Sequence, residues 1–326
     1  MFAVMSVAVY ASDTVGATVA AGAASAAEKS FISRWLPYFI AGISNGGQYA
    51  LIAIGYTMVY GILRLINFAH GDIFMCAGLM MVYLCASSIP VYISIPLVLI
   101  LTVALGFIVE RLAYKPLRSA PRMSVMISAI GVSYLLQNFA WYATGGLAKQ
   151  YPTLSFLVKP IALGSVQVKT VTLITPVVTI VLVLLLQLLI KKTKVGMAMR
   201  AVSFDFETSR LMGVKINSVI SVTFIIGSFL AAMGSVLYFS AYTTVTPTVG
   251  AMPGLKAFIA AVFGGIGSIP GAVIGAFVIG IVENIIKGLA NGAYSTFSDA
   301  FTFALLILIL VVKPTGLFGE NLKEKV

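Results

Sequence analysis

Long apolar runs alternate with short polar loops along most of this chain. The clearest runs cover about residues 37–60, 91–109, 123–143, 171–190 and 217–239. Each is close to the roughly 20 residues that an α-helix needs to cross the hydrocarbon core of a bilayer. The runs are continuously apolar rather than alternating, which is typical of membrane helices rather than of strands. The pattern therefore predicts an all-α, polytopic membrane protein.

Three further apolar stretches are less regular. Residues 73–86 are short for a crossing, and residues 300–312 form the last run. Residues 255–286 are interrupted by Gly264-Gly265-Ile266-Gly267-Ser268-Ile269-Pro270-Gly271, so they can cross once or twice. Membrane helices tolerate Gly and Pro where neighbours satisfy the freed backbone groups. We predict about eight to nine membrane segments in a single domain, residues 37–326.

Residues 1–36 are treated as an N-terminal extension. They are rich in Ala and Val, and the stretch Ala24-Ser25-Ala26-Ala27-Glu28-Lys29 resembles a small-residue cleavage site. No basic region precedes the apolar part, and Asp13 interrupts it. A processed leader, an extra span and a disordered extension all stay open.

The composition supports the membrane class and narrows the partners. Hydrophobic residues make up 60% of the 326 and charged residues only 10%, with a mean hydropathy of +1.05, which excludes an ordinary soluble domain. The net charge of +11 would suit nucleic acid, but the basic residues lie in loops between apolar runs. There they mark the cytoplasmic side and attract anionic headgroups. We expect membrane lipid, and no nucleic acid, as a partner.

Motifs of enzymes and metal sites are missing from the sequence. It contains no phosphate-binding Gly-x-x-x-x-Gly-Lys-Ser/Thr loop, no nucleophile elbow and no His-Glu-x-x-His pair. Cys76 and Cys85 share one apolar run without ligand-like spacing, so we expect neither a disulfide nor a metal site. The sequence predicts no enzyme and no cofactor.

The basic loops predict the orientation of the chain. Residues 110–122 and 190–215 are the most basic loops, and both are cytoplasmic if the spans between them alternate. Residues 144–170 then face outward, although they carry three lysines. We place the C-terminal tail on the inside. Glu110 and Glu283 are expected at span ends, at the membrane interface.

The loop of residues 191–217 contains a predicted amphipathic helix. At 100° per residue its side chains divide into two faces, with Ala201, Phe204, Thr208 and Leu211 on one and Ser203, Glu207 and Arg210 on the other. Gly213 is a predicted C-terminal stop, and Asn217 or Ser218 a predicted cap of the next helix. Such a helix between two spans is placed to receive a push from a soluble partner. A solvated basic loop that only fixes topology explains the same residues.

Two interrupted segments are candidates for a substrate path. Asn67, His70 and Asp72 precede the short run 73–86, so irregular backbone can enter the bilayer there, where it must be buried in protein or line a watery cavity. The second segment, in the later half, centres on three glycines: Gly264, Gly265 and Gly267. A pair of broken segments in two halves of a chain points to a substrate path. Ordinary interfacial loop residues are the alternative.

Four stretches resemble one known family. They are Gly47–Asp72, Gly196–Val214, Ala260–Ala272 and the ending Lys313–Gly319. They resemble the inner-membrane permease of branched-chain amino acid ABC transporters, the LivH type. The resemblance runs from about residue 38 to 320.

The resemblance implies a role and a set of partners. The chain would be a bacterial inner-membrane subunit of an ATP-driven importer, paired with a homologous LivM-like permease, two cytoplasmic ATPases that hydrolyse ATP, and an extracytoplasmic binding protein. The residues that would dock on the ATPase are Arg200, Ala201, Phe204, Glu207, Leu211 and Gly213. Phe204 and Phe206 depart from the small or acidic residues that family members often carry there.

Other functions stay open. A urea or short-amide ABC permease shares these motifs. An ion-driven secondary transporter fits any polytopic chain, but it calls for a carboxylate inside the membrane, and we expect none. A structural membrane scaffold would predict no transport.

Overall fold

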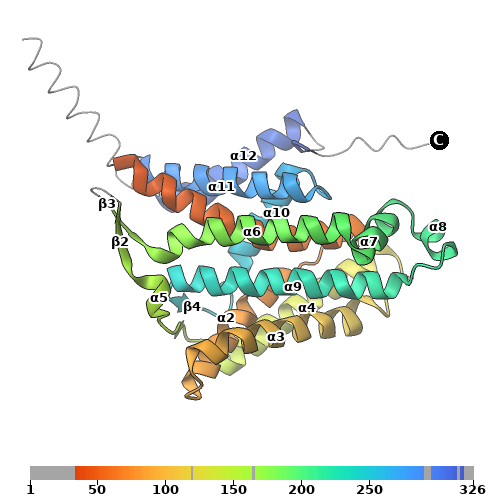
Figure 1. The fold of residues 1–326 in the computed structure, drawn as a ribbon, viewed down its shortest axis with the longest axis horizontal. Helices are drawn as coiled ribbons and strands as arrows, with labels where there is room; N and C mark the ends of the chain where they lie inside the picture. Colours follow the sequence, from red (N-terminus) through yellow and green to blue (C-terminus); the bar gives the residue numbers. More distant parts are fainter. Residues whose placement is uncertain (1–33, 119, 164–165, 290–294, 314–315, 319–326) are drawn as a thin grey trace, which may run out of the picture.

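The computed structural model describes residues 34–118, 120–163, 166–289, 295–313 and 316–318. Residues 1–33, most of the predicted N-terminal extension, lie outside the described residues. Long helices lie side by side in a bundle, with α7 and α8 at one end and the short strands at the other (Figure 1). We call these the α7–α8 end and the strand end.

The helices confirm the predicted all-α membrane class. Six of the described helices are long and apolar enough to cross a membrane: α3 with its π-helical continuation (Val91–Tyr114), α4 (Arg122–Thr144), α6 (Thr170–Lys192), α9 (Ile216–Ala241), α11 (Ile269–Gly288) and the segment Ser295–Val312, which contains α12 (Ser298–Val312). Two apolar helices are shorter, α2 (His70–Ala86) and α10 (Ala251–Gly264). Another helix occupies residues 34–63. Most of the apolar runs predicted from sequence match these bounds within a few residues.

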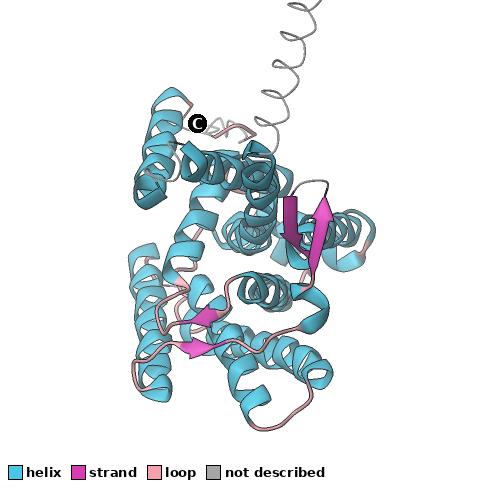
Figure 2. Cartoon of the chain, turned by 90° about the vertical axis from the view of Figure 1, so that its left-hand side faces the viewer, coloured by secondary structure: helices cyan, strands magenta, loops and turns pink. Residues whose placement is uncertain are grey.

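Two small sheets define the strand end. β1 (Lys149–Gln150) pairs antiparallel with β4 (Thr244–Val245), and β2 (Pro160–Leu163) pairs antiparallel with β3 (Val166–Lys169). The short helix α5 (Ser155–Val158) lies between them in sequence. Figure 2 looks onto this end of the bundle. Residues 144–170 therefore lie opposite the loop that carries α7 and α8, as the alternation of spans predicts.

The other basic loop and the C-terminal segment lie at the α7–α8 end. Arg118 donates a hydrogen bond to the Asn217 side chain at the start of α9. Farther along the chain, the backbone N–H groups of Leu317 and Phe318 donate to the carbonyls of Phe263 and Gly264, at 2.9 and 3.0 Å. The predicted shared side of the two basic loops is consistent with this arrangement.

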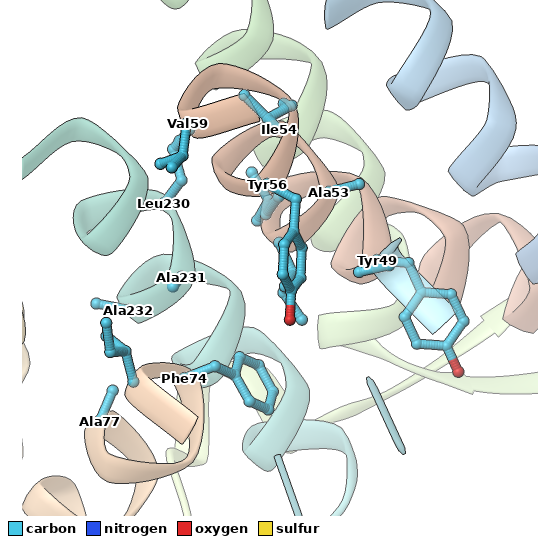
Figure 3. Close-up of a cluster of buried hydrophobic side chains, with 14 of the residues drawn as sticks. Tyr49, Ala53, Ile54, Tyr56, Val59, Phe74, Ala77, Leu230, Ala231 and Ala232 are labelled. Atoms are coloured by element: carbon cyan, nitrogen blue, oxygen red, sulfur yellow. The ribbon is translucent and has the colours of Figure 1, made fainter. Parts of the chain in front are cut away.

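The 34–63 helix, α2 and α9 form the core of the bundle. Residues 50–54 are fully buried. In Figure 3, Ala77 of α2 lies close to Ala232 of α9, and Leu230 of α9 lies beside Val59 of the 34–63 helix. Most of α9 is buried, whereas most residues of α3, α4 and α6 are not. The three less buried helices therefore form the outer layer, whose apolar faces suit lipid.

Small residues let α10 and α11 pack as a tight hairpin. A Cβ atom on Gly271 would lie 2.3 Å from the Gly264 carbonyl oxygen, and one on Gly275 would lie 2.4 Å from that of Ala260. Gly267 lies in the turn between the helices with a φ of +100°. Gly271 and Gly275, four residues apart, thus let the two helices approach closely.

The helices α2 and α10 begin inside the bundle rather than at its ends. His70, the first residue of α2, contacts Gly55, which lies eight residues before the end of the 34–63 helix. At 1.5 Å per residue this is about 12 Å from that end. A Cβ atom on Gly250 would lie 2.1 Å from the Gly71 carbonyl oxygen, and one on Gly254 would lie 3.0 Å from the Gly71 Cα. The N-termini of both helices therefore meet backbone to backbone.

This contact predicts a difference between two glycine substitutions. Gly250→Ala places a methyl group against the Gly71 backbone, so α10 must move away from α2, at a cost of about 1–3 kcal/mol. Gly131→Ala on α4 is the matched control, because a Cβ atom there meets nothing within 4 Å. Alanine also has the better helix propensity. We expect a lower melting temperature of the detergent-purified protein for Gly250→Ala alone; equal melting temperatures would contradict the contact.

Candidate functional site

The loop after α6 folds into two helices, α7 (Lys194–Phe204) and α8 (Phe206–Leu211). The prediction of one amphipathic helix with Ala201, Phe204, Thr208 and Leu211 on one face is wrong. The break falls at Asp205, whose backbone is extended with φ −151° and ψ 118°.

The Asp205 side chain is the physical reason for the break. Its Oδ1 accepts hydrogen bonds from the backbone N–H groups of Glu207 and Thr208, at 2.9 and 3.1 Å. Its Oδ2 accepts from the Thr208 hydroxyl at 2.6 Å. These bonds cap the first turn of α8, and the hydrogen bonds from Thr208 lower the pKa of Asp205. The Asp-x-x-Thr spacing was the signal in the sequence that periodicity analysis missed.

Of the two predictions for helix ends in this loop, one is confirmed and the other is wrong. Gly213 has a φ of +82° and follows the last turn of α8, which confirms it as a helix stop. The predicted cap at Asn217 or Ser218 is wrong, because α9 begins at Ile216 without a side-chain cap. Asn217 instead accepts the hydrogen bond from Arg118.

The predicted coupling residues all lie on the exposed surface of this loop: Arg200, Ala201, Phe204, Glu207, Leu211 and Gly213. Phe204 is 88% exposed, Leu211 87% and the neighbouring Met212 80%. Lipid would cover exposed apolar residues on the spans, but these three lie on the loop at the end of the bundle (Figure 1). Large exposed apolar side chains in that position are typical of a protein contact surface.

The opposite face of α7 packs on the bundle. Gly196, Met199 and Val202 are buried, and a Cβ atom on Gly196 would lie 2.3 Å from the Ile190 Cα of α6. Arg64, just past the end of the 34–63 helix, donates a hydrogen bond to the Ser203 carbonyl at 3.3 Å.

A cavity of about 140 Å³ lies where α7 meets the rest of the protein. It is lined by residues of α7, of the 34–63 helix and of the α10–α11 turn, among them Arg200, Gly61 and Gly267. The loop therefore lies beside the end of the 34–63 helix and the α10–α11 turn.

Most of the predicted path residues have packing roles in the structure. The Tyr114 hydroxyl donates to Asn67 Oδ1 at 2.7 Å. His70 is 2% exposed and fills a slot beside Gly55, with its ring centroid 5.0 Å from that of Tyr56. The glycines Gly264, Gly265 and Gly267 shape the α10–α11 turn.

Asp72 differs because it lines a larger cavity, of about 310 Å³. It is 2% exposed, and its carboxylate accepts hydrogen bonds from Ser133 Oγ at 2.5 Å and Gln137 Nε2 at 3.0 Å. Gly71, Gly250 and Gly254 also line this cavity. The structure thus separates Asp72 from Gly267, which lines the smaller cavity.

The sequence analysis named Glu283 and Glu110 but missed that both are buried and paired with basic side chains. Glu283 is 1% exposed and accepts from Tyr49 at 2.9 Å, and it forms ion pairs with Lys256 and Lys287 at 2.9 and 2.6 Å. Lys256 also pairs with Asp299 at 2.7 Å. Glu283 lies five residues before the end of α11 and is enclosed by side chains of α10, α11 and the 34–63 helix. Its expected place at the membrane interface stays a prediction. The Glu-x-x-x-Lys spacing to Lys287 was its only local signal.

Glu110 is fully buried at the end of α3. Arg118 forms an ion pair with it, and the Ser221 hydroxyl of α9 donates to it at 2.9 Å. Its expected place at a span end is confirmed, but it is enclosed in protein. Burial in the bundle does not show where Glu110 lies relative to the membrane, so the expectation of no carboxylate inside the membrane stays a prediction.

The chain matches known transport proteins over most of its length. Residues 38–310 match the family described as "Branched-chain amino acid transport system / permease component". The high-affinity branched-chain amino acid transport system permease protein BraD of Pseudomonas aeruginosa is 38% identical over 311 residues, covering 90% of this chain and 99% of the relative. The permease protein LivH of Salmonella typhimurium is 39% identical over 298 residues, covering 87% and 96%.

More distant similarities also exist. The fructose import permease protein FruF of Bifidobacterium longum is 24% identical over 300 residues, covering 87% of this chain and 80% of the relative. A solved inward-facing structure of a putative metal-chelate type ABC transporter covers 89% of this chain and 90% of its own, with 16% identity and a TM-score of 0.49. That structural similarity is too low to support an argument.

The Asp205 cap predicts local unfolding of α8 in one variant. Asp205→Ala removes the acceptor of two backbone N–H groups, so α8 should fray while α7 stays folded. Asp205→Asn keeps an acceptor and is the matched control. Hydrogen exchange should be faster across residues 206–211 in Asp205→Ala alone; unchanged exchange there would contradict the cap.

The same cap predicts a pH dependence. Hydrogen bonds from Thr208 lower the pKa of Asp205, so the stabilisation of α8 is fully present above the unfolded-chain pKa of about 3.9. It is lost as the pH falls through the lower folded-state value. We expect constant protection of residues 206–211 between pH 5 and 8 and a decline only on acidification below about pH 4, measured by the same exchange experiment.

Proposed function

Because this chain belongs to the branched-chain amino acid transport permease family, we propose that it is a membrane subunit of an ATP-driven importer of branched-chain amino acids. It is a multi-pass protein of the bacterial inner membrane, and ATP is hydrolysed by separate partner subunits. The observation that carries the proposal is the 38–39% identity to permeases of that named substrate class over about nine-tenths of the chain.

We propose that the complete importer contains a LivM-like second permease, two cytoplasmic ATPases and an extracytoplasmic binding protein. The exposed apolar cluster of Phe204, Leu211 and Met212 supports an ATPase contact at the α7–α8 end. The binding protein would then dock at the strand end, which lies on the opposite side of the bundle (Figure 1).

The contacts of α7 support a mechanical route from the ATPase to the interior. Ser203 of α7 accepts the hydrogen bond from Arg64, which is followed within six residues by the start of α2. The cavity beside Arg200 also touches the α10–α11 turn through Gly267. A rigid-body movement of α7 would therefore press on the segments next to the two shorter apolar helices, α2 and α10. A small difference in packing energy, of a few kcal/mol, is enough for ATP binding to shift such an equilibrium.

We propose nine helical segments in one domain of residues 37–326, with residues 191–217 as its coupling loop. Six long apolar helices, the two shorter ones and the 34–63 helix support this number. The 34–63 helix joins the early and late halves, because a Cβ atom on Gly46 would lie 2.7 Å from Phe277 and one on Gly234 would lie 3.4 Å from Leu51. The halves therefore share one packed interior.

The candidate path residues fall into two proposed roles. Asp72 lines the substrate path directly. The other candidates hold the interrupted segments in place: Asn67, His70 and Gly264 pack on neighbouring helices, and Gly265 and Gly267 adopt the positive φ of the α10–α11 turn.

The coupling role predicts a separation of ATP hydrolysis from uptake. Leu211→Glu or Gly213→Arg puts a charge into the exposed apolar cluster, so the ATPase should lose its contact while the membrane spans still insert. In the reconstituted importer, uptake of labelled leucine should fall at least about tenfold, and its linkage to ATP hydrolysis should be lost. Leu211→Met, which keeps an apolar side chain, is the matched control.

Unchanged leucine uptake by Leu211→Glu would reject the coupling role. The isolated chain in liposomes should carry no solute, and transport without ATPase subunits would favour an ion-driven transporter. Competition of labelled leucine by excess urea or fructose would point to a permease of another substrate class.

A further inference from the structure

Three carboxylates are almost fully buried in the described part of the chain, and one of them differs from the others. Glu110 pairs with Arg118, and Glu283 pairs with Lys256 and Lys287. Each of these two carboxylates is neutralised by a basic side chain. Among the residues that the structure describes, no lysine or arginine forms an ion pair with the third carboxylate, that of Asp72.

The partners of Asp72 are neutral. Ser133 and Gln137 of α4 donate hydrogen bonds to its two oxygen atoms. These bonds orient the carboxylate but add no positive charge. A buried charge without a countercharge is costly, and an ionisable residue inside a membrane domain is expected to have a functional partner. A cationic ligand would supply the missing positive charge next to Asp72, as Lys256 does next to Glu283.

The cavity beside Asp72 has the shape and lining for a small amphipathic ligand. Its volume of about 310 Å³ lies at the lower end of the range of small-molecule sites, roughly 300–1,000 Å³. The polar groups Asp72, Ser133 and Gln137 lie along α2 and α4. The rest of the lining is mainly apolar and includes Ile66, Phe68, Ile130, Leu255 and Phe258.

The cavity also lies where the N-termini of the two shorter apolar helices, α2 and α10, meet. Part of the cavity wall is backbone, because three glycines line it: Gly71 of α2, Gly250 just before α10, and Gly254 within α10. In transporters, binding sites near the middle of the membrane are commonly built by such discontinuous helices. A change in the relative position of α2 and α10 would change the shape of this cavity.

We propose that this cavity is a transient substrate site within the permease. The Asp72 carboxylate accepts hydrogen bonds from the ammonium group of an aliphatic amino acid, and the apolar wall contacts the branched side chain. The inference rests on the proposed function and adds to it a residue that recognises the substrate inside the membrane domain.

The test uses the complete reconstituted importer with its leucine-loaded binding protein. Asp72→Asn keeps the shape and one acceptor oxygen and removes the charge; the Ser133 hydroxyl or the Gln137 Oε1 must then accept from the new amide N–H. We expect stimulation of ATP hydrolysis by the loaded binding protein to stay within about twofold of the unchanged importer. Leucine transported per ATP should fall at least about tenfold, and Asp72→Glu should recover part of it.

Two results with Asp72→Asn would overturn the inference. One is an unchanged ratio of leucine to ATP, which would mean that the charge does not contact the substrate. The other is a parallel loss of uptake and of stimulated ATP hydrolysis, which would make Asp72 a structural residue. If the unchanged importer itself fails to take up leucine with ATP, the proposed function fails instead.

A second variant tests the apolar wall. Ala251→Leu narrows the cavity, so the maximal uptake rate of leucine should fall more than that of the smaller valine. Ala304→Leu, on the exposed face of α12, is the matched control and should leave the leucine-to-valine ratio unchanged. An equal ratio in Ala251→Leu and Ala304→Leu would count against a substrate in this cavity.

Discussion

The contact between the Gly71, Gly250 and Gly254 backbones is the constraint on which the interior depends. Because none of these residues has a Cβ atom, the first turns of α2 and α10 approach each other directly. Both helices can therefore begin inside the bundle, and the chain segments that lead to them need not span the full membrane thickness. The cavity beside Asp72 exists because of this arrangement: its wall there is backbone, where larger side chains would fill the space.

Buried charge follows a consistent rule in the rest of the bundle. Glu283, Lys256, Lys287 and Asp299 balance one another in a network that joins α10, α11 and α12. Glu110 and Arg118 do the same at the end of α3. Low-dielectric surroundings make an unbalanced charge expensive, so pairing is the common outcome. Asp72 differs from these pairs because no basic side chain forms an ion pair with it in the described part of the chain. Since it lines a cavity, a bound ligand can supply the positive charge instead.

The α7–α8 loop combines two surfaces with opposite requirements. The buried face of α7, at Gly196, Met199 and Val202, packs on the bundle and reaches the 34–63 helix through Ser203 and Arg64. The outer surface carries large apolar side chains that none of the described residues covers. Firm packing on one side and an open apolar surface on the other suit an element that passes a force from a soluble neighbour into the bundle.

The sequence by itself determined the membrane class and the main helices, because hydrophobicity and run length depend only on the residues of each segment. The run 91–109 is an example, since α3 has these bounds. Only the tertiary structure decided which polar residues meet. Glu283 and Lys256 are 27 residues apart, and Asp72 and Gln137 are 65 apart. The break at Asp205 was encoded locally, but apolar periodicity does not register a side chain that caps the backbone. Partners distant in sequence leave no local pattern, so the charge balance around Asp72 became visible only once the helices were packed.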